Sequence, residues 1–182
     1  MRRRERHLIV LDRDGVINAD SDDYIKSPDE WLPLPGSLEA IARLDRAGFD
    51  VVVATNQSGV GRGLFSAEAL EAIHARMRRM IAAAGGSIAG IYVCPHRPDD
   101  GCDCRKPLPG LLHRIGEDFG RSLRGVPFVG DKLSDVEAAR AVGAHAMFVS
   151  TSGEDQDRRQ VEALGVPVYR DLAHAVDVLL RE

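Results

Sequence analysis

Two acidic residues, Asp12 and Asp14, stand one residue apart directly after the short apolar run at residues 7–11. Such a run, bounded by Gly15, is typical of a buried parallel strand, so both carboxylates are expected at its carboxyl end. Two carboxylates this close repel each other, and Mg²⁺ removes that repulsion because it prefers oxygen ligands. One carboxylate can then act as a nucleophile beside the metal. The other interpretation is an ordinary turn, since Asp and Gly are common turn residues.

A second set of metal-ligand types lies within residues 94–104. The loop offers three thiols and one imidazole, from Cys94, Cys102, Cys104 and His96. Three sulfurs and one nitrogen complete a closed tetrahedral zinc site, which is therefore structural. The chain has three cysteines in all, and this odd number disfavours disulfides. The alternative, buried free cysteines, needs an apolar setting that this charged loop does not offer. We expect zinc to direct Arg105 and Lys106, the next two residues, into the site.

The elements that must position these side chains alternate along the chain. Strand-like runs are expected at residues 7–11, 51–54, 88–93, 126–129, 144–149 and 166–169. Amphipathic helical runs separate them, beginning near residues 37, 66, 108 and 134 and after each of the last two strands. Polar or glycine-rich loops are expected at residues 18–35 and 55–63. This alternation predicts an α/β fold, a three-layer Rossmann-like parallel sheet with helices on both faces.

Length and composition indicate one domain and exclude several classes of protein. The 182 residues, 44% of them hydrophobic, suit a single domain over residues 1–182. A net charge of −4 argues against a nucleic-acid-binding protein. No apolar stretch approaches the ~20 residues that span a bilayer, and no signal peptide follows the arginine-rich start. We therefore expect a soluble, cytoplasmic protein with a disordered tail at residues 1–6.

The candidate functional residues share one predicted location. Asp12, Thr55 and Asp131 each follow directly after an expected strand. Because the carboxyl ends of parallel strands meet at one edge of the sheet, these three side chains should converge there. Unrelated turn residues would not converge in this way.

Four short motifs, read in order, resemble those of a known superfamily. They are DRDGV at residues 12–16, TNQSG at 55–59, RKP at 105–107 and GDKLSD at 130–135. In this order they resemble the four motifs of the haloacid dehalogenase superfamily of phosphotransferases, over about residues 8–149. The resemblance implies a Mg²⁺-dependent phosphomonoester hydrolase whose cap is reduced to short loops and the zinc loop.

Each motif then has an expected chemical role. Asp12 attacks phosphorus and forms an aspartyl-phosphate, and Asp14 protonates the leaving alkoxide and later takes a proton from water. Thr55 contacts the transferring phosphoryl oxygens. Lys106 supplies positive charge to the phosphoryl group and to Asp12.

Magnesium is expected to bind in the same place. Its ligands are Asp12, the backbone carbonyl of Asp14, and Asp131, while Asp135 orients the site from nearby.

The zinc loop further resembles two families, the heptose 1,7-bisphosphate 7-phosphatases and the histidinol-phosphate phosphatases. The stretch TNQSGVGRG is similar to the former, and Arg105 suits a second phosphate because a guanidinium grips phosphate in a planar fork. The short zinc loop is similar to the latter, and Asp22-Asp23-Tyr24 replaces the His-Gly-Tyr usual in these relatives. By this resemblance the substrate contacts are Arg13, Asp20, Ser21, Asp22, Asp23, Tyr24, Asn56, Gln57, Ser58, Arg105 and Lys132.

The expected reaction is removal of the C7 phosphate of D-glycero-D-manno-heptose 1,7-bisphosphate, on the path to nucleotide-activated heptose for lipopolysaccharide. The alternatives are a histidinol-phosphate phosphatase and a non-catalytic zinc-loop interaction domain. The second acid, Asp14, argues against the last, because a binding module has no need of it. We expect a monomer that binds a small phosphorylated sugar, with no nucleic-acid or membrane partner.

Two groups of side chains have no assigned chemistry at this point. Four histidines fit ordinary packing or surface positions, namely His74, His113, His145 and His174. Tyr24 and Trp31 fit equally well the floor of a substrate pocket and the packing of the first loop.

Overall fold

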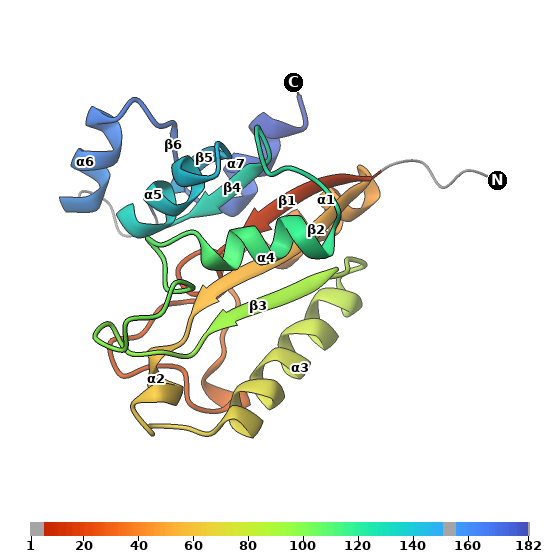
Figure 1. Ribbon diagram of the computed structural model, residues 1–182. Helices are drawn as coiled ribbons and strands as arrows, with labels where there is room; N and C mark the ends of the chain where they lie inside the picture. The colour runs from red at the N-terminus through yellow and green to blue at the C-terminus, as the bar shows by residue number, and fades with distance from the viewer. Residues whose placement is uncertain (1–5, 151–155, 182) are drawn as a thin grey trace.

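A six-stranded sheet forms the centre of the computed structural model, which describes residues 6–150 and 156–181 (Figure 1). Its strands are β1 (His7–Leu11), β2 (Phe49–Asn56), β3 (Gly90–Cys94), β4 (Pro127–Gly130), β5 (His145–Val149) and β6 (Val168–Tyr169). All neighbouring strands are parallel, in the order β3-β2-β1-β4-β5-β6. From β1 the chain therefore adds β2 and β3 on one side of β1, and then β4, β5 and β6 on the other side of β1. Such a switch point opens a crevice at the carboxyl ends of the strands, where ligands bind.

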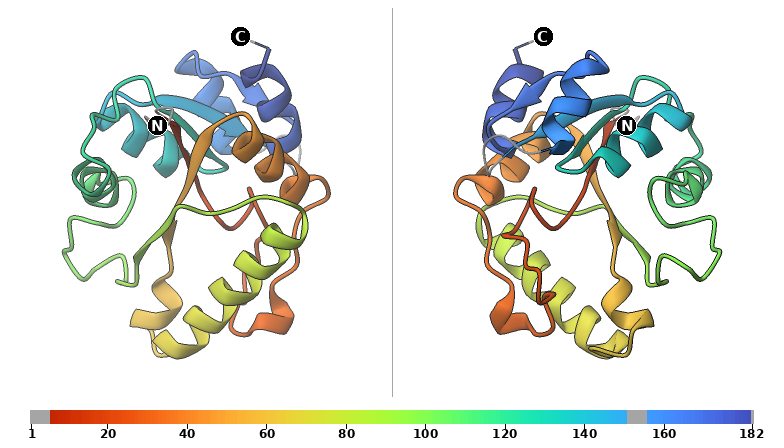
Figure 2. Two further views of the ribbon diagram at one scale, coloured as in Figure 1. Left: turned by 90° about the vertical axis from the view of Figure 1, so that its right-hand side faces the viewer. Right: turned by 90° about the vertical axis from the view of Figure 1, so that its left-hand side faces the viewer.

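Helices cover both faces of this sheet (Figure 2). The helical segments are η1 (Pro28–Glu30), α1 (Ser37–Arg46), α2 (Ser58–Gly61), α3 (Ala67–Ala83), α4 (Gly110–Asp118), α5 (Leu133–Ala141), α6 (Gln156–Ala163) and α7 (Leu172–Leu179). Alternate residues of β1 point to opposite faces. Ile9 and Leu11 join the core under α1, α3 and α7, whereas Leu8 and Val10 join the core under α4, α5 and α6. The predicted three-layer α/β fold is confirmed.

Several boundaries differ from those that the sequence predicts. The third strand begins at Gly90 and includes Cys94, so the first thiol of the zinc loop sits on a strand end. The expected loop at 55–63 contains the helical turn α2. Close packing needs glycine there, because a Cβ at Gly59 would lie 2.2 Å from the Phe65 ring and one at Gly61 would lie 2.6 Å from the carbonyl oxygen of Pro95.

The long loop between β1 and α1 packs against the core through Trp31. Its side chain is fully buried in the same cluster as Ile17 and Ile25. Tyr24, by contrast, lines the cavity at the strand ends and adopts a positive φ of 66°. Of the two positions that the sequence left open for these aromatic residues, Trp31 therefore takes the packing position and Tyr24 the position at the cavity.

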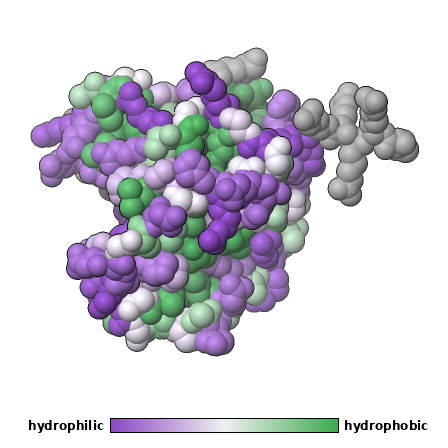
Figure 3. All heavy atoms as spheres, viewed as in Figure 1, coloured by the Kyte–Doolittle hydropathy of each residue, from purple (hydrophilic) through white to green (hydrophobic). Residues whose placement is uncertain are grey.

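The start of the described chain is held against the sheet. Arg6 forms ion pairs with Asp45 and Asp50 and donates a hydrogen bond to the carbonyl oxygen of Phe49. The prediction of a disordered tail at residues 1–6 is therefore wrong for Arg6, and residues 1–5 lie outside the described residues. Hydrophilic and apolar residues are interspersed on the face shown in Figure 3. Among the described residues, none of the helices combines the length and apolar character that a bilayer crossing requires.

Candidate active site

A cavity of about 450 Å³ opens at the carboxyl ends of the central strands. Most of the expected site residues line it, including Asp12, Asp14, Asp20, Ser21, Asp22, Tyr24, Asn56, Gln57, Ser58, Arg105, Lys106, Lys132 and Asp135. Thr55 is buried at the end of β2, and Asp131 follows β4 beside Asp12. The convergence expected for Asp12, Thr55 and Asp131 is therefore present.

Asp12 is buried and faces an ammonium group. Its Oδ1 lies 2.8 Å from Nζ of Lys106, and its backbone N–H donates to the carbonyl oxygen of Val129 on β4. Burial and the nearby charge of Asp135 raise the pKa of Asp12 to about 6, although Lys106 acts in the opposite direction. Asp12 is thus a carboxylate with little water around it, which suits a nucleophile.

Three carboxylates, that of Asp12 among them, lie close together. Oxygens of Asp12, Asp131 and Asp135 lie within 4.8 Å of one another, close enough to hold one metal ion. Burial, followed by the charges of Asp12 and Asp135, raises the pKa of Asp131 to about 9. Its Oδ1 is buried without a hydrogen-bond partner. Glycine at position 15 makes room for it, because a Cβ there would lie 2.0 Å from Oδ2 of Asp131.

Asp135 differs from the other two acids because both of its oxygens have protein donors. Oδ2 accepts the backbone N–H groups of Asp131 and Lys132, each at 3.2 Å, at the start of α5. Oδ1 lies 2.6 Å from Nζ of Lys106. Asp135 therefore orients the lysine and the loop after β4.

Lys106 is held on all sides. Besides the two carboxylates, its Nζ donates to the carbonyl oxygen of Ala54 at 2.8 Å. Burial alone would lower the pKa of Lys106, but Asp12 and Asp135 raise it well above its ordinary value. The side chain of Asn56 exchanges two hydrogen bonds with the backbone of Lys106, at 3.0 and 3.1 Å. A fixed positive charge is thus available beside Asp12.

Asp14 is surrounded by hydrogen-bond donors. The guanidinium of Arg13 forms an ion pair with Oδ1 at 2.9 Å, Asn18 donates to Oδ1 at 2.9 Å, and Gln57 donates to Oδ2 at 2.7 Å. Burial would raise the pKa of Asp14, but the Arg13 charge and these hydrogen bonds hold it below its ordinary value. Asp14 is thus a carboxylate in a defined orientation.

Some residues expected to touch substrate are engaged with the protein instead. Arg13 is fully buried and lies against Asp14 and His74 rather than lining the cavity. Asp23 is not among the cavity-lining residues either. The side-chain amides of Asn56 and Gln57 line the cavity but bind Lys106, Asp14 and Thr55. Sequence motifs identify such residues without distinguishing contact with substrate from support of a neighbour.

The sequence also left useful residues unassigned. Asn18 supports Asp14, and Ser134 lines the cavity. His74, expected to be an ordinary packing residue, is buried with Nε2 3.2 Å from Nη1 of Arg13. One signal was available for His74, since it interrupts the apolar face of α3 between Leu70 and Met77.

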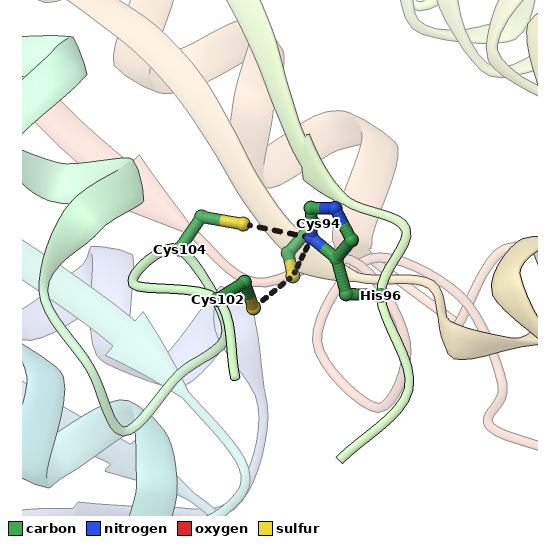
Figure 4. Close-up of side chains that lie close together, drawn as sticks. All are labelled: Cys94, His96, Cys102 and Cys104. Atoms are coloured by element: carbon green, nitrogen blue, oxygen red, sulfur yellow. Dashed lines mark hydrogen bonds between the residues drawn. The ribbon is translucent and has the colours of Figure 1, made fainter. Parts of the chain in front are cut away.

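The four zinc-ligand candidates lie close together at the end of β3 and in the loop that follows it (Figure 4). Sγ of Cys94 lies 3.7 Å from Sγ of Cys102 and 3.6 Å from Nδ1 of His96, which lies 3.3 Å from Sγ of Cys104. All four ligand atoms fall within 4.8 Å of one another and could hold a metal ion. Arg105 follows Cys104, lines the cavity and donates a hydrogen bond to the carbonyl oxygen of His96. The zinc loop therefore contacts a residue of the cavity wall.

Comparisons with known proteins identify similar chains. A family model described as HAD-hydrolase-like matches residues 103–175. The D-glycero-beta-D-manno-heptose-1,7-bisphosphate 7-phosphatase of Pseudomonas aeruginosa is 53% identical, over 97% of this chain and 99% of that protein.

Two solved structures are also similar. The D,D-heptose 1,7-bisphosphate phosphatase of Bordetella bronchiseptica, complexed with magnesium and phosphate, is 50% identical with a TM-score of 0.89, and the match covers 96% of this chain and 98% of that one. The corresponding enzyme of Burkholderia thailandensis is 41% identical with a TM-score of 0.72, covering 97% and 100%.

Proposed function

This chain belongs to the heptose 1,7-bisphosphate 7-phosphatase family of haloacid dehalogenase-like hydrolases, and we propose that it removes the C7 phosphate of D-glycero-D-manno-heptose 1,7-bisphosphate. The observation that carries the proposal is the buried Asp12 carboxylate, held 2.8 Å from Lys106 at the floor of an open polar cavity. The reaction lies on the path to nucleotide-activated heptose for lipopolysaccharide.

In the first half-reaction Asp12 is the nucleophile. Its carboxylate oxygen bonds to phosphorus while the bond from phosphorus to the C7 oxygen breaks, which leaves an aspartyl-phosphate and the sugar alcohol. Lys106 neutralises charge on the phosphoryl oxygens. Oγ1 of Thr55 accepts a hydrogen bond from Gln57 at 2.9 Å, so its own hydroxyl hydrogen can be donated to a phosphoryl oxygen.

Asp14 moves the protons of both half-reactions. Its donors favour the carboxylate, and a phosphate monoanion brings the proton that Asp14 passes to the C7 oxygen as that oxygen leaves. In the second half-reaction the carboxylate takes a proton from the water that attacks the aspartyl-phosphate. Phosphate is released and Asp12 is restored.

The acid cluster suits one magnesium ion. When ionised, the three carboxylates and the Lys106 ammonium together carry a net charge of −2, which one divalent cation balances. The unpartnered Oδ1 of Asp131 offers a free ligand. Asp12, Asp131 and the backbone carbonyl of Asp14 hold the ion, and Asp135 supports them. When bound, the ion stabilises negative charge on the phosphoryl group.

The cavity rim binds the rest of the substrate. Arg105 grips the non-reacting phosphate, and Lys132 adds a second positive charge to this part of the cavity. Nζ of Lys132 lies 2.9 Å from Oδ2 of Asp20, and both residues line the cavity. The loop from Asp20 to Tyr24 therefore presents carboxylates and a phenol to the sugar hydroxyls.

The cysteine and histidine cluster would bind structural zinc. Zinc–sulfur bonds of about 2.3 Å in a tetrahedron place the sulfurs about 3.8 Å apart. The Sγ atoms of Cys94 and Cys102 are 3.7 Å apart. Four protein ligands would leave no open position, so a zinc ion held here would order the loop that carries Arg105 and Lys106.

A second candidate, histidinol phosphate, is favoured only by the short stretch between His96 and Cys102. A substrate panel separates the two. We expect kcat/KM for heptose 1,7-bisphosphate to exceed that for histidinol phosphate by roughly a hundredfold, because Arg105 gains a partner only with a bisphosphate. Both anomers of the bisphosphate belong in the panel. A preference for histidinol phosphate would refute the proposed substrate, and no phosphate release at all would indicate a binding module. Monomeric state and cytoplasmic location stay predictions.

A further inference from the structure

The buried guanidinium of Arg13 connects the proposed acid/base residue to helix α3. Nε of Arg13 donates to Oδ1 of Asp14 at 3.0 Å, and Nη2 donates to Oδ2 at 3.2 Å. The third nitrogen, Nη1, points away from Asp14 and lies 3.2 Å from Nε2 of His74. Both Arg13 and His74 are buried, with 0% and 3% of their surface exposed, so the contact is shielded from bulk solvent.

The chemistry of the two groups fixes the direction of the bond. A guanidinium has only donors, so Nε2 of His74 is the acceptor and the ring is neutral with its hydrogen on Nδ1. Burial and the Arg13 charge lower the pKa of His74 to about 4, in agreement with a neutral ring. A buried guanidinium N–H that lacked an acceptor would shift to find one.

We propose that His74 is a positioning residue, which acts through Arg13 to hold the Asp14 carboxylate in line with the leaving oxygen of the substrate. The inference rests on the acid/base role proposed for Asp14. His74 lies on α3 among buried neighbours, Leu70 and Met77, and α3 runs beside the loop that follows β1 (Figure 2). A regular helix therefore supports a catalytic loop.

The proton transfer itself supplies a specific test. As Asp12 bonds to phosphorus and the ester bond breaks, the proton on Asp14 moves to the departing oxygen. An alkoxide needs that proton, whereas p-nitrophenolate is stable without it. A displaced Asp14 should therefore slow alkyl phosphates more than p-nitrophenyl phosphate in kcat/KM, which reports the first irreversible step.

The experiment compares His74→Leu, which removes the acceptor, with His74→Gln, whose amide oxygen can reach Arg13. For His74→Leu we expect kcat/KM to fall roughly tenfold with the best alkyl phosphate of the substrate panel and about twofold or less with p-nitrophenyl phosphate. His74→Gln should restore the alkyl phosphate rate to within about threefold of the unaltered enzyme. If His74→Leu does not fold, His74→Asn, whose amide falls short of Arg13, replaces it.

Equal losses on both substrates would overturn the inference, because a smaller folded fraction lowers both rates alike. So would a His74→Gln variant as impaired as His74→Leu. Asp14→Asn is measured in parallel. Its kcat/KM should fall more with the alkyl phosphate than with p-nitrophenyl phosphate, and the difference between the two losses should be larger than in His74→Leu. If Asp14→Asn slows both substrates equally, the acid role of Asp14 in the proposed function fails. If Asp14→Asn slows the alkyl phosphate more than p-nitrophenyl phosphate but His74→Leu slows both equally, only the positioning role of His74 fails.

Discussion

Individual side chains at this site act through their neighbours. Asp12 and Lys106 are 94 positions apart in the chain, yet their charged atoms lie 2.8 Å apart in a buried setting. Asn56 holds the backbone of Lys106, and Asp135 holds its ammonium. The reactivity proposed for one carboxylate therefore depends on residues from three segments of the chain.

Replacing Asp12 tests the nucleophile. Asp12→Asn keeps the size of the side chain but removes the oxygen that bonds to phosphorus, so phosphate release should fall by roughly ten-thousandfold. Steady-state phosphate release measures the loss. Circular dichroism and zinc content should match those of the unaltered protein. Turnover near the original rate would mean that another group attacks phosphorus.

At the scale of elements, the site depends on the residues at the carboxyl end of each strand. Asp12 and Asp131 come directly after β1 and β4, Thr55 lies in the last two residues of β2, and Cys94 ends β3. The sequence predicted these strands because short apolar runs of five or so residues are typical of buried parallel strands. It did not predict α2, because that turn depends on the close packing of its glycines against Phe65 and the Pro95 backbone.

The loop between β3 and α4 provides a test at the scale of an element. Cys104→Ser should lose zinc and lower kcat by roughly tenfold or more, because Lys106 is two residues away and its placement depends on the loop. Elemental analysis and steady-state kinetics measure the two effects. Asp103→Ser, an exposed neighbour that is no ligand, is the matched control and should keep both. Unchanged metal content in Cys104→Ser would rule out this zinc site.

For the whole molecule, the acid cluster links stability to pH. The pKa values of Asp12 and Asp131, about 6 and about 9, lie above the ordinary value near 4 of an unfolded chain. An acid whose pKa is raised on folding stabilises the fold below about pH 4, and that stability is lost as the pH rises through the folded-state value. The metal-free protein should therefore lose stability between about pH 4 and about pH 9.

Magnesium should reverse this loss because it binds the ionised carboxylates. We expect the rise in Tm on adding Mg²⁺ to be larger at about pH 8 than at about pH 5, as measured by thermal unfolding with and without the ion. Asp131→Asn removes one ligand and should reduce the increment at the higher pH. Equal increments at both pH values would show that the cluster does not bind the ion in this way.

The sequence by itself determined the order of the strands and of most helices along the chain, the four motifs and the set of metal-ligand types. Apolar periodicity and turn residues are local properties, and Cys94, His96, Cys102 and Cys104 lie close in the chain, so each could be identified without a structure. The sequence also assigned Arg13 to the substrate, where the structure places it on Asp14 and His74.

Only the tertiary structure decided the supporting contacts of the site. It bound Lys106 to Asn56 and Asp135, and it buried Trp31 in the core while Tyr24 lines the cavity. These contacts join segments tens of residues apart, and their geometry depends on how the helices and loops pack on the sheet. Packing is a property of the whole chain, which no local pattern contains.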